Sequence, residues 1–243
     1  MIEARELSKH FKDGKRGLVR AVDGISFECK GGEVYGLLGP NGAGKTTTLR
    51  LLSTSLRPTS GTALVNGIDV VSNPEKVRSQ IGFLSGNTGI YGRLTPREMV
   101  GYFGELYGMS DEIITKRTDE VFSMLDMHDF ADVRNEKLST GMKQKVSIAR
   151  AVIHDPPVMV FDEPTTGLDV MSSRTIVEFI RRCRDENKCV IFSTHIMSEA
   201  MRLCDRAAII HKGRIFASGS IQEILERAGE DNLEDAFIKI VGE

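Results

Sequence analysis

The sequence contains no tryptophan, no long hydrophobic run and no excess of basic residues. Its longest apolar runs, Val158 to Phe161 and Ala207 to Ile210, are far shorter than the roughly 20 residues that cross a bilayer, so no membrane span is predicted. The 32 lysines and arginines are balanced by 34 aspartates and glutamates, which gives a formal charge of −2. Because nucleic-acid binding depends on neutralising phosphates, this balance predicts no nucleic-acid partner.

Signals for export and for disulfide bonds are also missing. The N-terminal segment MIEARELSKHFKDGKRG is charged and lacks the apolar stretch of a signal peptide, so a cytoplasmic location is expected. None of the four cysteines belongs to a C-x-x-C pair. We interpret Cys29, Cys183, Cys189 and Cys204 as reduced thiols that serve as small core residues.

The pattern of apolar residues changes twice along the 243 residues. Residues 1–71 contain short segments typical of strands, with a hairpin signal at Asn66-Gly67. Residues 95–153 show helical spacing, and residues 158–210 alternate apolar strands with helices. Fully apolar strands that alternate with helices predict a parallel sheet covered on both faces.

These changes predict one α/β unit with a parallel sheet, an N-terminal antiparallel β part and an inserted helical subdomain. Thr95 and Glu98 have the form of a capping box at the start of the helical section. Ser110 and Ser139 are expected to cap its later helices. The predicted divisions are a core over residues 1–84 and 158–218, a helical subdomain over residues 85–157 and a C-terminal tail over residues 219–243.

The segment after the apolar run Val34 to Leu38 has the form G-x-x-x-x-G-K-[ST], which is typical of a phosphate-binding loop. Glycines allow such a loop to turn its N–H groups toward phosphate oxygens, and the helix that follows adds its positive dipole. Lys45 is expected to contact the β- and γ-phosphates, and the Thr46 hydroxyl is expected to hold Mg²⁺. The candidate nucleotide-binding residues are Gly39, Pro40, Asn41, Gly42, Ala43, Gly44, Lys45, Thr46 and Thr47.

Two carboxylates end the apolar run Val158 to Phe161. Because ligands bind at the carboxyl ends of parallel strands, Asp162 and Glu163 are expected to lie near the phosphate loop. Asp162 is a candidate for the Mg²⁺ shell, through water. Glu163 is a candidate for accepting a proton from, or orienting, the water that attacks the γ-phosphate.

The sequence Leu138-Ser-Thr-Gly-Met142 predicts a second anion site. Ser139 is a natural N-cap, and a capped helix start beside Gly141 presents N–H groups that also bind anions. One nucleotide does not readily fill both this site and the loop at Lys45 in a single subunit. We therefore predict a head-to-tail homodimer, in which Ser139 and Gly141 of one copy cover the γ-phosphate that the other copy holds.

Together these motifs resemble the nucleotide-binding subunit of an ABC transporter, over essentially the whole chain. LSTGM resembles the signature sequence of that family, and it lies closely upstream of VMVFDE. The resemblance implies that Asp169, at the end of PTTGLD, lines the dimer interface, and that His195 is the switch histidine that contacts the γ-phosphate. It also matches Phe11 to the aromatic residue that stacks on adenine, with a core position for Phe11 as the open alternative.

The segment from Leu138 to Asp169 and the tail from Gly219 are similar to ATP-binding subunits of ABC-2 exporters, including bacterial sodium and drug efflux systems. This resemblance implies an ATPase that uses ATP and Mg²⁺, powers a separate transmembrane permease and lies on the inner face of the cell membrane. Two alternatives stay open: a soluble ATPase of an assembly or repair machine, and a nucleotide-dependent regulator with little hydrolysis. These motifs do not identify the transported substrate.

One position departs from the pattern of the family. The family usually places a glutamine after the segment Ile81 to Ser85, where it touches Mg²⁺ and the attacking water, and this sequence has Gly86 there. In one interpretation, Asn87 takes over the contact. In the other, the segment is a joint in which Gly86 permits backbone angles with φ > 0. We favour the joint.

Overall fold

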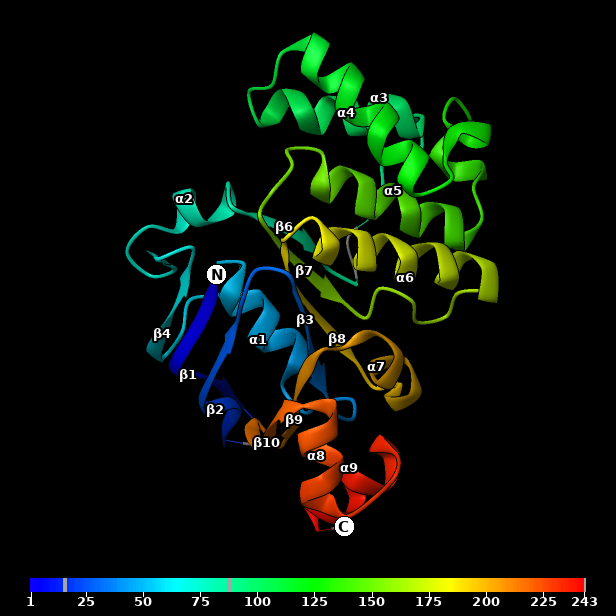
Figure 1. Cartoon of the computed structure of the whole chain (residues 1–243). Coiled ribbons are helices and arrows are strands. Elements are labelled where there is room, and N and C mark those ends of the chain that lie inside the picture. The colour runs from blue at the N-terminus through cyan, green and yellow to red at the C-terminus, as the bar shows by residue number, and fades with distance from the viewer. Residues whose placement is uncertain (15–16, 87–88, 243) are drawn as a thin grey trace.

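Two β-sheets form the centre of the structure, a computed structural model that describes residues 1–14, 17–86 and 89–242 (Figure 1). The smaller sheet is antiparallel and has the strand order β2-β1-β4-β5. The larger sheet has the order β10-β9-β3-β8-β7-β6, and only β10 runs antiparallel to its neighbour. The strands are β1 (Ile2–Asp13), β2 (Gly17–Cys29), β3 (Glu33–Leu38), β4 (Ser60–Val65), β5 (Ile68–Asp69), β6 (Ile81–Leu84), β7 (Val158–Asp162), β8 (Cys189–Thr194), β9 (Arg206–His211) and β10 (Arg214–Ser220).

Helices cover both faces of the larger sheet, as the apolar strands predict. The helices α3, α4 and α5 gather at one end of the molecule, and α8 and α9 gather at the other (Figure 1). Within the described residues, no helix is both long enough and apolar enough to span a membrane. The helices are α1 (Lys45–Leu52), α2 (Pro74–Arg78), α3 (Pro96–Leu106), α4 (Asp111–Met124), α5 (Thr140–Val152), α6 (Val170–Asp185), α7 (Met197–Leu203), α8 (Ile221–Ala228) and α9 (Leu233–Val241), with 3₁₀ turns at His128–Phe130 and Asn135–Lys137.

Apolar cores on the two faces of the larger sheet join these layers. Val160 of β7 is buried with Leu49 of α1 in the core that also holds the antiparallel sheet. The next residue, Phe161, belongs to the core on the opposite face, together with Phe122 of α4. Successive strand residues point to opposite faces, so the apolar run of β7 is buried on both sides. A smaller core around Leu233 holds α7, α8 and α9.

The N-terminal part confirms the predicted hairpin and corrects the predicted strand lengths. β4 and β5 pair across Asn66-Gly67, with Val65 opposite Ile68. β1 and β2 are 12 and 13 residues long, where the sequence predicts short strands. They are long because they pair with each other from end to end, through several register shifts. Such shifts break the strict alternation from which strand length is predicted.

The helix caps are confirmed at two of three predicted positions. Thr95 and Glu98 form the capping box, and the Ser139 hydroxyl accepts the backbone N–H of Met142 at 3.3 Å. Ser110 precedes α4, but its side chain makes no capping hydrogen bond, so the expected cap is absent there. Acidic side chains in the first turn of α4 complement the helix dipole instead.

The order of the larger sheet places β8 between β3 and β7. Ser193 of β8 pairs with Leu37 of β3 on one side and with Asp162 of β7 on the other. Because these strands are parallel, the segments that follow them begin at the same edge of the sheet. This edge therefore brings together the phosphate loop, Glu163 and His195, which lie far apart in the sequence.

A half-buried histidine joins the ends of two helices in the helical section. The ring of His154, just after α5, stacks on the ring of Tyr107, just after α3, with centroids 3.7 Å apart. Burial lowers the pKa of His154 to about 4. The imidazole is therefore uncharged in the folded chain at neutral pH.

We predict that His154 makes the fold less stable in acid. In the unfolded chain its pKa is near 6.5. Below that pH the unfolded state takes up a proton that the folded state does not bind until about pH 4, so the free energy of unfolding falls by up to about 3 kcal/mol over this range. His154→Phe keeps a ring for the stack and removes the proton. Urea unfolding at about pH 7 and about pH 4.5 should show a smaller loss for the variant, and an equal loss in both proteins would contradict this role.

Candidate functional site

Close backbone contacts shape the loop between β3 and α1. A Cβ atom at Gly39 would lie 2.1 Å from the carbonyl oxygen of Ile210, and one at Gly44 would lie 2.4 Å from the carbonyl oxygen of Ala21. Both approaches require glycine, and Gly44 also has a φ of 112°. Within the described chain, the backbone N–H groups of residues 45–47 have no acceptor. They are the donors that a helix N-terminus offers to phosphate oxygens.

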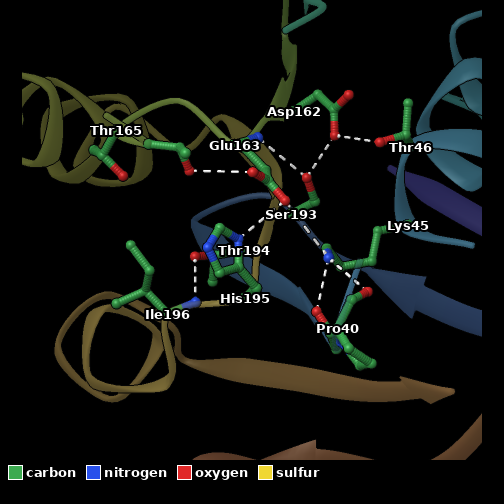
Figure 2. Close-up of polar contacts among 12 residues, drawn as sticks. Pro40, Lys45, Thr46, Asp162, Glu163, Thr165, Ser193, Thr194, His195 and Ile196 are labelled. Carbon is green, nitrogen blue, oxygen red and sulfur yellow. Dashed lines mark hydrogen bonds and ion pairs between the residues drawn. The ribbon is translucent and has the colours of Figure 1, made fainter. Parts of the chain in front are cut away.

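Lys45 is a buried cation beneath this loop (Figure 2). Its side chain is 4% exposed, and its Nζ donates to the carbonyl oxygens of Gly39 at 2.7 Å and Pro40 at 3.1 Å. The same Nζ lies 3.6 Å from Oε1 of Glu163. Burial lowers the pKa of Lys45, and the charge of Glu163 partly offsets this effect. The ammonium is therefore held at the position where the sequence predicts phosphate oxygens.

Asp162 joins three elements through one carboxylate oxygen. Its Oδ1 accepts the hydroxyl of Thr46, on α1, at 3.0 Å and the hydroxyl of Ser193, on β8, at 2.7 Å (Figure 2). Ser193 is fully buried, and its Oγ also accepts the backbone N–H of Glu163 at 3.1 Å. Sequence reasoning selects His195 in the segment Ser-Thr-His and misses Ser193. Its role depends on the register of β7 and β8, which only the sheet reveals.

The carboxylate of Glu163 lies between two nitrogen groups. Its Oε1 is 3.2 Å from Nδ1 of His195 and 3.6 Å from Nζ of Lys45, and its Oε2 accepts the hydroxyl of Thr166 at 3.2 Å (Figure 2). Burial raises the pKa of Glu163, but the bond to His195 and the charge of Lys45 together outweigh it, so the pKa lies below its ordinary value. Glu163 is therefore ionised at neutral pH and can accept a proton.

The donor set fits a nucleotide phosphate with Mg²⁺. Mg²⁺ prefers oxygen ligands and keeps several of its waters, so it needs few protein ligands. The Thr46 hydroxyl and the Asp162 carboxylate supply two oxygens 3.0 Å apart at the start of α1. Lys45 and the open N–H groups of residues 45–47 supply the positive side of the site for phosphate oxygens.

The start of α5 lies against the start of α6. A Cβ atom at Gly141 would lie 2.2 Å from the Ser172 hydroxyl and 3.3 Å from Oδ2 of Asp169. Asp169 caps α6, because it accepts the backbone N–H of Ser172 at 2.9 Å and its hydroxyl at 2.7 Å. These bonds lower the pKa of Asp169. Sequence reasoning missed this cap, although an aspartate three residues before a serine at a helix start is a recognisable signal.

Phe11 lies on the surface of β1. Its side chain is 39% exposed, and the ammonium of Lys9 lies 5.4 Å from its ring centroid. The alternative of a core position for Phe11 is therefore wrong. Stacking of this ring on adenine stays a prediction.

Gly86 lies next to the acid of the metal site, and it is not among the residues with positive φ. The conformational freedom that glycine permits at this position is therefore not used in this structure. Among residues 1–14, 17–86 and 89–242, a Cβ atom there would have one neighbour within 4 Å, the carbonyl oxygen of Asp162 at 3.8 Å. These residues leave room for a side chain at this position. Asn87, the proposed substitute for the missing glutamine, lies outside the described residues.

Comparisons with known proteins agree with this geometry. Residues 22–166 match the ABC transporter family, a range that includes the phosphate loop, Asp162 and Glu163. The chain is 42% identical over 239 residues to the ABC transporter ATP-binding protein NatA of Bacillus subtilis, which covers 98% of this chain and 97% of NatA. It is 37% identical over 225 residues to the Nod factor export ATP-binding protein I of Burkholderia lata, which covers 93% of this chain and 72% of that protein.

A solved structure resembles the whole arrangement. It is the dimeric structure of a post-hydrolysis state of the ATP-binding cassette MJ0796 bound to ADP and Pi. The TM-score is 0.83 at 27% sequence identity, and the similarity covers 91% of this chain and 99% of that chain.

We predict that Ser193→Ala weakens the use of Mg²⁺ more than it weakens the fold. The change removes one of the two hydroxyls on Asp162, so the Mg²⁺ concentration for half-maximal nucleotide hydrolysis should rise about tenfold. A titration with Mg²⁺ at saturating nucleotide measures this. Ser198→Ala, at an exposed serine on α7, is the control and should leave the titration unchanged. Equal titrations for Ser193→Ala and the unmodified chain would argue against a metal site at Asp162.

Proposed function

The chain belongs to the ABC transporter family, and from this premise we propose that it is the ATP-binding subunit of an exporter and drives a separate transmembrane permease. It binds ATP with Mg²⁺ and is an ATPase. One observation supports the proposal most: five predicted site residues lie together at one edge of the sheet (Figure 2). They are Lys45, Thr46, Asp162, Glu163 and His195. Export is favoured because a relative of this chain is named as an export ATP-binding protein.

Each residue at this edge has a distinct part in the proposed hydrolysis. Lys45 binds the phosphates that the loop and the start of α1 surround. Thr46 and, through water, Asp162 would hold Mg²⁺, which supplies positive charge for the phosphate oxygens. Glu163 accepts a proton from the attacking water or orients it, and its lowered pKa keeps it ionised for this purpose. His195, bonded to Glu163, contacts the γ-phosphate.

A γ-phosphate would also change the partners of Lys45. The ammonium faces the carboxylate of Glu163 at 3.6 Å. Phosphate oxygens compete for this ammonium and draw it from Glu163, whose carboxylate then turns more fully toward water and His195. An ionised carboxylate at Glu163 can act on the attacking water, so it favours a hydrolysing enzyme over a regulator with little hydrolysis.

We infer that two copies form a head-to-tail dimer around ATP. Ser139 is exposed at the start of α5, and Val170 and Met171, which begin α6, are 82% and 71% exposed. These features lie on neighbouring helix starts, since Gly141 adjoins Asp169. An exposed apolar pair beside helix N-terminal donors suits contact with a second copy whose loop carries phosphate. The solved relative with bound ADP and Pi is described as dimeric.

The permease is proposed to dock on the α3 surface, which we define as Tyr91, Tyr102, Leu106 and Tyr107. These side chains are between 42% and 63% exposed. Among them, Tyr107 also lines a cavity of about 230 Å³, together with Arg150. Exposed aromatic residues beside a cavity are typical of binding surfaces. In a membrane complex this surface would place the chain against the inner face of the membrane.

Arg150 contacts both α3 and the segment that contains Gly86. Its guanidinium donates to the carbonyl oxygen of Gly89 at 3.0 Å and lies over the ring of Phe103 at 5.4 Å. Residue 89 belongs to the same segment as Gly86, which adjoins Asp162. This connection supports the interpretation of the segment as a joint, and the proposed division into a core (residues 1–84 and 158–218), a helical subdomain (residues 85–157) and a tail (residues 219–243).

We predict that different substitutions abolish ATP binding, ATP hydrolysis and dimerisation. Lys45→Ala should abolish ATP binding, because it removes the cation that contacts the phosphates. Glu163→Gln should keep ATP binding, lose turnover and accumulate as a dimer with ATP, because Glu163 acts mainly on the attacking water. Adding Ser139→Arg to Glu163→Gln should abolish the dimer and keep ATP binding.

Size-exclusion chromatography with ATP and a fluorescent-nucleotide titration measure these outcomes. Hydrolysis by Glu163→Gln at the unmodified rate would remove Glu163 from the mechanism. A dimer that forms equally well with Ser139→Arg would contradict the head-to-tail arrangement.

A second prediction tests the permease. Leu106→Glu places a charge in the α3 surface and should abolish co-purification of an integral membrane protein with the tagged chain from solubilised membranes of its native cell. Ile238→Glu on α9 is a matched control, because Ile238 is also more than half exposed. The basal ATPase rate of both variants should stay within about twofold of the unmodified chain. Absence of any membrane partner for the unmodified chain would favour an ATPase that works in solution.

A further inference from the structure

The relative position of two loops determines the contact between Glu163 and His195. Glu163 begins the segment after β7, and His195 begins the segment after β8. Their side chains are 24% and 37% exposed and approach to 3.2 Å. Neither side chain lies in a packed core, so packing does not fix this distance. Ser193 holds the backbone N–H of Glu163, and a tie farther along the two segments would limit the movement of their side chains.

Glu199, in the first turn of α7, provides such a tie. One carboxylate oxygen accepts the hydroxyl of Thr165, and the other accepts the hydroxyl of Thr194 at 2.9 Å. Thr165 lies two residues after Glu163, and Thr194 directly precedes His195. The two threonines are 6% and 1% exposed. Both oxygens of Glu199 thus accept buried hydroxyls from the two segments, and without Glu199 each hydroxyl would lose this acceptor.

An acid in the first turn of a helix often completes the cap, and this role does not account for both bonds. The backbone N–H of Ile196, the N-cap of α7, donates to the Thr194 hydroxyl at 3.0 Å (Figure 2). Thr194 therefore serves the cap, and Glu199 holds Thr194 in place. The bond to Thr165 leaves α7 for a different segment. This bond does not contribute to the helix cap, and it joins the segment after β7 to the segment after β8.

A cavity beside Glu199 makes the bridge more important for holding the two segments. Thr165 and Glu199 line a cavity of about 660 Å³ between α6 and α7, whose wall also includes Leu168 and Arg202. Where side chains leave such a space, they do not hold the neighbouring segments together by close packing. Beside this cavity, the carboxylate of Glu199 joins the two segments through hydrogen bonds.

We propose that Glu199 is a positioning residue for ATP hydrolysis, which holds the segments of Glu163 and His195 in register through Thr165 and Thr194. The inference rests on the proposed roles of Glu163 and His195. Displacement of a catalytic group by about 1 Å reduces turnover by up to about a hundredfold. Loss of Glu199 should therefore act on kcat and leave ATP binding at Lys45 nearly intact.

Steady-state kinetics of Glu199→Ala test this. We expect kcat to fall about tenfold and the KM for ATP to change by less than about twofold. Glu178→Ala is the matched control, since Glu178 lines the same cavity but pairs with Arg174 on its own helix.

Two milder variants keep the test independent of folding. Glu199→Gln accepts only one of the two hydroxyls through its amide oxygen, so its kcat should lie between those of Glu199→Ala and the unmodified chain. Thr165→Val removes one bond without changing the shape of the side chain. Combining Thr165→Val with Glu199→Ala should give no further loss beyond Glu199→Ala, because both changes break the same bridge.

The outcomes separate the inference from the proposed function. An unmodified chain that does not hydrolyse ATP would overturn both. Hydrolysis by the unmodified chain with an unchanged kcat in Glu199→Ala overturns only the positioning role. So does a fall in kcat that only matches the loss of folded protein, measured by thermal unfolding, or one that Glu199→Gln does not partly restore.

Discussion

The carboxylate of Asp162 is the point at which the parts of the site meet. It ends β7, and its Oδ1 accepts hydroxyls from Thr46 on α1 and Ser193 on β8. Both bonds depend on the strand order β3-β8-β7 and on the register that sets Asp162 beside Ser193. A shift of this register would bury polar groups without partners and turn the apolar residues of β7 to the wrong faces. The register of β7 and β8 that stabilises the fold is therefore the same register that builds the site.

A second constraint is the balance of charge beneath the loop. Lys45 is almost fully buried, which by itself favours its neutral form. The carbonyl oxygens of Gly39 and Pro40 and the carboxylate of Glu163 surround its ammonium. The same contact and the bond to His195 keep Glu163 ionised. The arrangement that keeps a cation available for phosphate therefore also prepares the carboxylate that is proposed to act on water.

The sequence predicts those features whose signals are local. The glycine spacing of the phosphate loop, the apolar strands and the capping box at Thr95 all lie within a few residues, and the structure confirms each. Ser193 and Glu199 escape sequence reasoning, because their partners come from other segments and are brought near only by the sheet. Gly86 shows a different limit: glycine permits a positive φ but does not require one.

In the proposed dimer, one chain carries only half of a working site. The start of α5, with Gly141, adjoins Asp169 of its own chain, while the phosphate loop lies at the edge of the sheet around Lys45. A second copy would bring the two halves together. The most direct test is the rate of ATP hydrolysis per chain, measured over a wide range of chain concentrations with light scattering to follow the mass. The rate per chain should rise with concentration and then level off, whereas a constant rate per chain in the monomeric range would contradict a site shared between two copies.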